Sequence, residues 1–233
     1  MFKIKMADFV IQIDNKYDFI FKMCRDYITE QDGADFCVSC SDEDMEAEKL
    51  ACDAKMPNGY IESVCIYRNL CTQLPLKDAF LIHCAVIEVD GKAYAFLAKS
   101  GTGKSTHISL WHKLLGNRVR VINGDKPIFR YIDGELYAYG TPWCGKEGWH
   151  TNTKAPLGGL CFIERATTNS IEPLPPQSSA SRVMNQIIIP GDAMGAIKTL
   201  ELMDRMLTDK KSWLLKCNIS TEAAQIAYNA LRE

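Results

Sequence analysis

The sequence has no excess of positive charge, no long apolar run and no biased segment. It contains 233 residues, with 27 Lys and Arg against 29 Asp and Glu, which gives a net charge of −2. Proteins that bind nucleic acids generally carry a basic surplus, so we expect no nucleic-acid partner. The absence of about 18 consecutive apolar residues argues against a membrane-spanning helix and a membrane partner.

The sequence also lacks the cysteine pattern of a zinc ribbon. Its ten cysteines are scattered, and only Cys37 and Cys40 form a C-x-x-C pair. No second pair follows at zinc-ribbon spacing, so a metal or redox role is the less favoured interpretation. Asp8 and Asp14 interrupt any apolar core of a signal sequence. We therefore expect a cytoplasmic protein whose reduced thiols serve as small hydrophobic side chains.

The overall composition is that of an ordinary globular protein. Hydrophobic residues make up 47%, with 15 Gly and 9 Pro, which excludes disordered and collagen-like chains. The length suits one large domain or two small ones. Because the pattern changes at Pro75, we expect an N-terminal α/β region over 1–75 and a second domain over 76–233.

The first third mixes strand and helix patterns without a catalytic constellation. Short apolar runs predict strands, and apolar residues at helical spacing predict helices. Ser41 followed by three acidic residues indicates a capped helix start. The expected strands are 9–13 and 36–39, and the expected helices are 17–28, 42–52 and 60–74.

Two Asp-Gly pairs indicate hairpins in the second region. Asp90-Gly91 separates the apolar run 79–89 from the run 93–98, and Asp133-Gly134 separates 128–132 from 135–139. The strand that ends at Ala98 is therefore the return arm of a hairpin, which predicts a mixed sheet. The other expected strands are 118–123, 157–163 and 213–219, and the expected helices are 104–115, 178–188, 192–208 and 221–231.

The segment Lys99-Ser100-Gly101-Thr102-Gly103-Lys104-Ser105-Thr106 lies between an expected strand and an expected helix. Its glycines let successive backbone N–H groups face one concavity, at which the positive end of the helix also points. In such a phosphate loop Lys104 neutralises the β- and γ-phosphates, and Ser105 holds Mg²⁺. The strict pattern begins with glycine where this chain has Ala98. We expect ATP and Mg²⁺ here, bound by Ser100, Gly101, Thr102, Gly103, Lys104, Ser105 and Thr106.

The surrounding sequence resembles a known family. The stretch from Leu81-Ile82-His83 through the loop to Asn123-Gly124-Asp125 is similar to the HPr kinase/phosphorylase catalytic domain and to phosphoenolpyruvate carboxykinase, and most of all to small bacterial HPr kinase-like proteins. His107, Leu110 and Trp111 continue the similarity, as does the segment 139–147. The resemblance covers roughly 78–190. It implies an α/β (α+β) fold in which a mixed sheet carries a phosphate loop flanked by helices.

The resemblance also implies roles for individual residues. The family has paired aspartates after the loop, and the matching positions here are Gly124 and Asp125. Asp125 is therefore expected to hold the metal and to accept the hydroxyl proton, although a turn aspartate is the alternative. His83 matches an active-site histidine and could donate a hydrogen bond or take a proton, although a buried core histidine is the alternative. His107 and His112 are interpreted as structural.

A segment rich in glycine, aromatic and charged residues, 143–150, follows the second hairpin. Such a loop could close over a nucleotide or an acceptor, with Lys146 on phosphate and Glu147 as a second carboxylate for metal. An ordinary solvent-exposed loop is the alternative. Arg165 and Arg182 are candidate phosphate clamps.

The expected function is an ATP-dependent kinase that transfers the γ-phosphoryl group to a hydroxyl, with Asp125, His83 and Lys104 as catalytic residues. A serine of a peptide or protein is the expected acceptor. Two alternatives stay open. The first is a nucleotide-binding regulatory protein with little transfer, which is favoured by Gly124 in place of a carboxylate. The second is a carboxykinase-like enzyme, which is weaker because the phosphate-loop domain leaves little chain for a site that binds a dicarboxylic acid. The sequence identifies neither the acceptor nor the nucleotide preference, and it leaves a homo-oligomer open.

Overall fold

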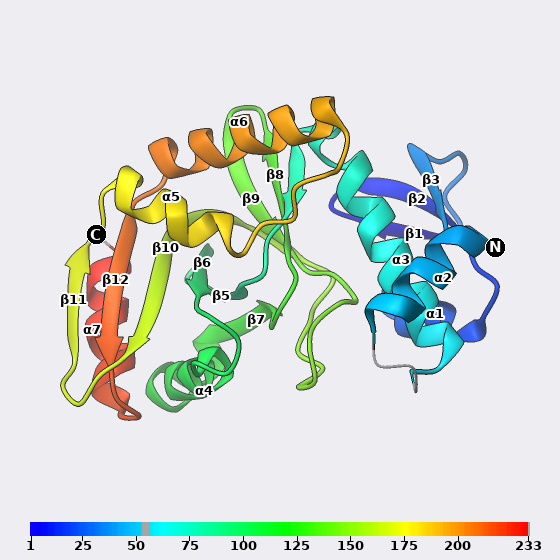
Figure 1. Cartoon of the computed structure of the whole chain (residues 1–233). Coiled ribbons are helices and arrows are strands. Elements are labelled where there is room, and N and C mark those ends of the chain that lie inside the picture. The colour runs from blue at the N-terminus through cyan, green and yellow to red at the C-terminus, as the bar shows by residue number, and fades with distance from the viewer. Residues whose placement is uncertain (53–55, 233) are drawn as a thin grey trace.

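The computed structural model describes residues 1–52 and 56–232. In this part of the chain, seven α-helices and twelve strands form a small N-terminal layer beside a larger mixed sheet with helices on both faces (Figure 1). The alternation of strand and helix patterns predicted this mixed α/β class. No helix in the described ranges is long and apolar enough to cross a lipid bilayer.

The N-terminal region is a three-stranded sheet packed against three helices. Its strands are β1 (Phe2–Met6), β2 (Phe9–Asp14) and β3 (Phe36–Ser39), with β1 antiparallel and β3 parallel to β2. Its helices are α1 (Asp18–Met23), α2 (Asp42–Ala51) and α3 (Asn58–Gln73). Ser41 and Asp44 form the capping box that starts α2, as the acidic cluster predicted.

The helix expected over 17–28 is wrong in its second half. Helix α1 ends at Met23, and a 3₁₀ turn (Arg25–Tyr27) follows. Beyond it the chain runs beside β1, where Ile28 bridges to Ile4. The helix cannot continue to residue 28 because the residues after the 3₁₀ turn pair with β1, a strand that the sequence analysis missed.

The larger sheet has nine strands. The main path follows the order β4-β8-β9-β10-β6-β5-β7, and β12 pairs with β10 and β11. These strands are β4 (Ala79–Leu81), β5 (Ala85–Val89), β6 (Lys92–Leu97), β7 (Val119–Asn123), β8 (Ile128–Ile132), β9 (Glu135–Tyr139), β10 (Lys154–Arg165), β11 (Ser170–Pro173) and β12 (Ser212–Cys217). Strand β11 was not anticipated.

Strand directions confirm the mixed sheet. Strand β6 is antiparallel to β5 and parallel to β10. Asp90 and Gly91 both have positive φ, as do Asp133 and Gly134, so both predicted Asp-Gly hairpins are present. The apolar run 79–89, however, is two strands. Between them His83 donates its backbone N–H to Gln186 O at 2.6 Å, where the chain crosses from one part of the sheet to the other.

Helices cover both faces of this sheet (Figure 1). One face packs against α5 (Pro176–Met184) and α6 (Ala193–Asp209), and the other packs against α4 (Lys104–Leu115) and α7 (Thr221–Leu231). Trp111 of α4 is fully buried on the second face. Packing against the sheet thus holds the buried side of α4, and the first turn of the helix follows the loop at the end of β6.

The N-terminal region shares its hydrophobic core with the larger sheet. That core includes Leu81, Ile128, Tyr139 and Trp143 from beyond residue 75. The tip of the β1–β2 hairpin also docks on the sheet, because Arg130 donates to Ala7 O at 2.6 Å and Asp8 accepts a hydrogen bond from Tyr139 at 2.6 Å. The contacts of the N-terminal region therefore extend to the strands that lead to the candidate site.

The ten cysteines are free thiols in the structure, and eight of them are buried. Cys37 is exposed whereas Cys40 is buried, so the two members of the C-x-x-C pair lie in different surroundings. Burial supports their use as small hydrophobic side chains. Their redox state in the cell stays a prediction.

Candidate functional site

The glycine-rich loop joins β6 to α4. Gly101 and Gly103 have φ values of 76° and 121°, which L-residues with a side chain rarely adopt. Gly103 is the N-cap of α4 and offers no side chain to the helix N–H groups. Arg165 supports the loop from β10, since its guanidinium donates to the carbonyls of Thr102 at 2.9 Å and Gly101 at 2.5 Å. Arg165 therefore contacts the loop itself.

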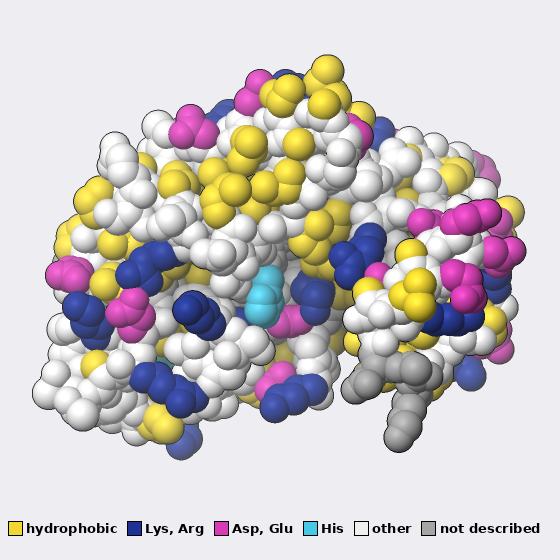
Figure 2. All heavy atoms as spheres, viewed as in Figure 1, with side chains coloured by type: hydrophobic (Ala, Val, Ile, Leu, Met, Phe, Trp, Pro, Cys, Tyr) yellow, Lys and Arg dark blue, Asp and Glu magenta, His cyan; other side chains and the backbone are white. Residues whose placement is uncertain are grey.

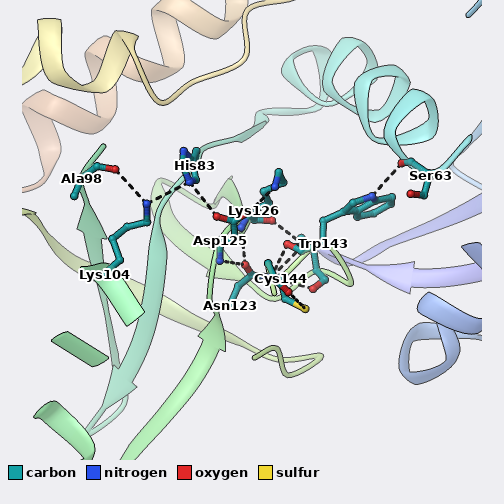
Figure 3. A network of polar contacts seen from close by, with 11 residues as sticks. Ser63, His83, Ala98, Lys104, Asn123, Asp125, Lys126, Trp143 and Cys144 are labelled. Carbon is teal, nitrogen blue, oxygen red and sulfur yellow. Dashed lines mark hydrogen bonds and ion pairs between the residues drawn. The ribbon is translucent and has the colours of Figure 1, made fainter. Parts of the chain in front are cut away.

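Lys104 is the first residue of α4, and its side chain turns back under the loop. It is only 9% exposed. Its Nζ lies 3.1 Å from Ala98 O and 3.2 Å from His83 Nε2 (Figure 3). Burial lowers the pKa of this ammonium, although the Asp125 carboxylate opposes the shift. The result is a largely desolvated cation at the end of β6.

His83 joins Lys104 to Asp125. Its Nε2 lies 3.0 Å from Asp125 Oδ1 and 3.2 Å from Lys104 Nζ. A single ring nitrogen either donates or accepts, so it cannot satisfy both neighbours at once. The protonated Nε2 donates to Asp125, and the unprotonated Nε2 accepts from Lys104. The structure thus brings together all three residues that the sequence analysis named as catalytic.

Asp125 stays ionised in these surroundings. Burial alone raises the pKa of its carboxyl group, but the His83 hydrogen bond and the Lys126 ion pair outweigh that effect and hold the pKa well below its usual range. Figure 2 shows Lys and Arg side chains on both sides of a histidine on one face of the molecule, with an acidic side chain beside it. Positive charge at this site is what an anionic ligand needs.

Asn123 fixes the turn that carries Asp125, and sequence reasoning missed it. It is fully buried, and its Oδ1 accepts from the backbone N–H groups of Asp125 at 2.8 Å and Lys126 at 2.7 Å. Its Nδ2 donates to Thr141 O at 2.9 Å. Asn at the end of a strand, before Gly-Asp, is a recognisable signal for such an Asx turn.

The position next to Asp125 has no room for a side chain. A Cβ built on Gly124 would lie 3.0 Å from Cys144 O and 3.4 Å from Trp149 O. The Gly124 N–H donates to that same Trp149 carbonyl at 2.8 Å. The loop that follows β9 therefore occupies the space that a second carboxylate at this position would need.

This loop is anchored at both ends of its aromatic segment. Trp143 is 8% exposed, and Trp143 Nε1 donates to Ser63 O at 3.1 Å. At the other end the His150 ring stacks on Tyr27, 5.7 Å between centroids. The N-terminal region thus holds both ends of the segment 143–150, whereas Gly145, Lys146 and Gly148 between them are exposed.

The two charged residues of this loop differ in exposure. Lys146 is exposed, whereas Glu147 is partly buried. A Cβ built on Gly145 would lie 3.5 Å from Asp125 Cγ and 3.7 Å from Glu147 Oε2. Both carboxyl groups therefore flank Gly145, and Glu147 is near enough to Asp125 to serve the same ligand.

Two cavities flank the glycine-rich loop. The larger, about 660 Å³, runs from Ala98–Thr102 to Gln186 near His83, and it includes Arg182, which pairs with Glu164 at 2.7 Å. The smaller, about 380 Å³, lies along the first turns of α4, with Leu110 and Ile219 in its wall. Arg165 borders both. The loop thus has space for ligand groups on each side.

The residues named for Mg²⁺ belong to two different segments. Ser105 lies in the first turn of α4, and Asp125 follows β7. Across residues 1–52 and 56–232, no cluster of three or more His, Cys, Asp or Glu side chains forms a ready metal site. Ser105 and Asp125 together offer one hydroxyl and one carboxylate, which would need oxygen atoms of a ligand to complete a coordination shell.

Comparison with known proteins gives little guidance. No family model matches the chain, and no curated protein matches it. One solved structure that aligns with it is the Hpr(Ser) kinase/phosphatase from Coxiella burnetii. The alignment covers 55% of this chain and 92% of that one, with a TM-score of 0.30 and 10% identity. A match at this level assigns no function, so the chemistry of the site depends on its own geometry.

Proposed function

We propose that this chain binds a nucleoside triphosphate, taken here as ATP, at the loop 98–106. It then transfers the γ-phosphoryl group to a hydroxyl, with a serine of a peptide or protein as the acceptor. The observation that carries the proposal is the meeting of Lys104 Nζ, His83 Nε2 and the Asp125 carboxylate, on three separate segments, where β6 ends. Phosphoryl transfer needs this kind of charge placement more than covalent chemistry.

The loop supplies the phosphate contacts. Two observations support this: the glycines at positive φ, and the start of α4, whose N–H groups no side chain caps. The Thr102 N–H is already used, since it donates to Lys99 O at 3.1 Å. Lys104 is released from Ala98 O and His83 when it meets phosphate oxygens instead, so its buried charge gains a partner of opposite sign. Arg165 keeps the loop carbonyls occupied and the loop in shape.

The donor set also fits a magnesium ion that accompanies the nucleotide. Ser105 Oγ and the ionised Asp125 carboxylate are the hard oxygen ligands that Mg²⁺ prefers when phosphate oxygens provide the rest. When bound, the ion supplies positive charge to the phosphate oxygens. Asp125 is suited to this role because its pKa is held so low.

The His83–Asp125 pair handles the acceptor hydroxyl. A carboxylate with so low a pKa is a weak proton acceptor by itself, so Asp125 first orients the hydroxyl. Its carboxylate takes up the hydroxyl proton as the new P–O bond forms and the bond from the γ-phosphorus to the leaving nucleoside diphosphate breaks, while His83 Nε2–H donates to the carboxylate. Once Lys104 has turned to the phosphates, His83 Nε2 has one remaining partner, Asp125. The pair is then fixed in a single arrangement.

A second candidate is nucleotide binding without transfer. The closed space around Gly124 favours it, because only one carboxylate follows β7. Glu147, which flanks Gly145 opposite Asp125, is the residue that would replace the missing carboxylate in the kinase. Labelled ATP incubated with candidate acceptor peptides separates the two candidates, since only the kinase labels an acceptor.

Binding is tested by calorimetric titration with Mg²⁺-ATP. We expect Lys104→Ala to weaken affinity at least 10-fold, because a charged hydrogen bond to phosphate contributes about 1.5–3 kcal/mol. Lys113→Ala is the matched control, since Lys113 lies exposed on the same helix and should leave affinity unchanged. Equal affinity in the wild type and Lys104→Ala would show that phosphate binds elsewhere.

A further inference from the structure

Trp143 belongs to the site loop, but its side chain lies in the core of the N-terminal region. The indole is buried in that core, and its ring centroid lies 5.7 Å from that of Tyr67 in α3. Its Nε1 donates to the backbone carbonyl of Ser63, also in α3, at 3.1 Å. The side chain therefore ties the start of the loop to one helix of the N-terminal region.

The backbone of the same residue faces the site. Trp143 O accepts from Asn123 Nδ2 at 3.4 Å, and it lies 3.2 Å from Thr141 Oγ1, whose single proton has a closer acceptor in Lys126 O at 2.7 Å. The other end of the Asn123 amide holds the backbone N–H groups of Asp125 and Lys126. A continuous set of buried polar contacts thus runs from α3 through Trp143 and Asn123 to the turn that carries Asp125 (Figure 3).

A second set of contacts reaches the same carboxylate. The Lys126 ammonium lies 5.8 Å from the centre of the Tyr67 ring and forms an ion pair with Asp125. The Tyr67 ring is also the neighbour of Trp143. Helix α3 therefore reaches Asp125 indirectly by two paths. One leads to the backbone turn that carries Asp125, and the other leads to Lys126, the cation paired with the Asp125 carboxylate.

We propose that Trp143 and Tyr67 are positioning residues through which the N-terminal region sets the place of the Asp125 carboxylate. The inference rests on the proposed function for the statement that transfer needs Asp125. It adds that the N-terminal region is part of the site's framework. A reacting group misplaced by 1 Å can lose roughly 10²-fold in rate, so a partial loss of these contacts costs about 10-fold.

The first variant is Trp143→Phe, which keeps an aromatic ring beside Tyr67 and removes the donor to Ser63 O. We expect faster hydrogen–deuterium exchange at the amides of Asp125 and Lys126, which Asn123 protects. In the same protein we expect single-turnover transfer to fall about 10-fold while the KM for ATP changes less than about 2-fold. Trp213→Phe is the matched control, since Trp213 is 7% exposed on β12 and packs over Gly159.

Tyr67→Leu provides a second variant that keeps the core apolar but removes the ring under Lys126. Tyr67→Phe restores the ring and should restore both the exchange protection and the rate. Unchanged exchange at residues 125–126 in both Trp143→Phe and Tyr67→Leu would overturn the proposal. If wild-type protein neither binds nor turns over nucleotide, the proposed function fails, and the exchange measurement still decides whether α3 holds the Asp125 turn.

Discussion

Two segments of the chain, 92–115 and 140–153, enclose the site around His83, and their shapes have different causes. The segment 92–115 is β6, the glycine-rich loop and α4, and its shape follows mainly from its own residues, with Arg165 of β10 as the added support of the loop carbonyls. The segment 140–153 is an irregular loop, and its shape follows from Trp143 and His150, whose partners Ser63 and Tyr27 lie in the N-terminal region. We call these two segments the walls of the site. The wall 92–115 depends mainly on local sequence, the wall 140–153 depends on tertiary packing, and the two should respond differently to substitution.

Asp125 stands between the two walls, and its substitution carries the largest expected effect. We expect Asp125→Asn to retain nucleotide affinity, because the loop amides and Lys104 are untouched. Single-turnover transfer should fall by about 10²- to 10⁴-fold, since the amide neither accepts a proton nor binds Mg²⁺ as a carboxylate does. Asp133→Asn in the exposed β8–β9 turn should have a normal rate. A normal rate in Asp125→Asn would move the proton acceptor to Glu147.

His107 tests the locally encoded wall through pH. Its Nε2 accepts from Trp111 Nε1 at 2.9 Å, and burial lowers the pKa of the ring to about 4. The unfolded chain binds this proton below about pH 6.5 and the folded chain does not. Stability should therefore fall by about 3 kcal/mol as the pH drops from 6.5 to 4. Urea unfolding of His107→Gln should lack that part of the loss, whereas exposed His112→Gln should keep it.

Gly124 tests the wall that depends on tertiary packing. We expect Gly124→Ala to destabilise the fold by about 1–3 kcal/mol, because the new methyl group meets Cys144 O and Trp149 O. Transfer per folded molecule should fall as well, since the loop must move away from Asp125. Thermal unfolding and single-turnover kinetics measure the two effects. Gly134→Ala is unsuitable as a control because of its positive φ, so Gly191→Ala serves instead, since a Cβ built on Gly191 meets no atom within 4 Å. A fully stable Gly124→Ala protein would contradict the close packing.

Ser41 lies outside both walls and has the smallest expected effect. Its hydroxyl accepts from Asp44 N at 3.0 Å to start α2. Ser41→Ala should lower stability by about 1 kcal/mol in chemical denaturation. The ATP affinity and the transfer rate should not change, because α2 contributes to neither set of contacts that reaches Asp125. A change in rate would extend the framework of the site beyond α3.

Local chemistry decides how much the sequence predicts. Asp-Gly turns, the Ser41 cap and the helix 104–115 depend on neighbouring residues, and each is found as expected. The meeting of His83, Lys104 and Asp125 was expected through the family resemblance. The role of Trp143 was not, because its contact with Ser63 joins residues far apart in the chain. The same reason explains the break between β4 and β5, where the His83 N–H donates to Gln186 O. The Asx turn of Asn123 is local, and the Asn-Gly-Asp sequence carried a signal for it that was missed. Strand β1 is also a different case, because it pairs locally with β2.

The placement of Trp143 has a consequence for biosynthesis. The N-terminal core contains this indole together with Leu81, Ile128 and Tyr139. When the first 75 residues have emerged from the ribosome, the N-terminal core therefore still lacks these side chains. It is completed only after residue 143 has emerged. Contacts over such separations form late, because closing a long loop costs entropy before any contact repays it. The nascent N-terminal region should consequently stay exposed to chaperones and proteases until the Asp125 turn is also available, so that core and site mature in the same step.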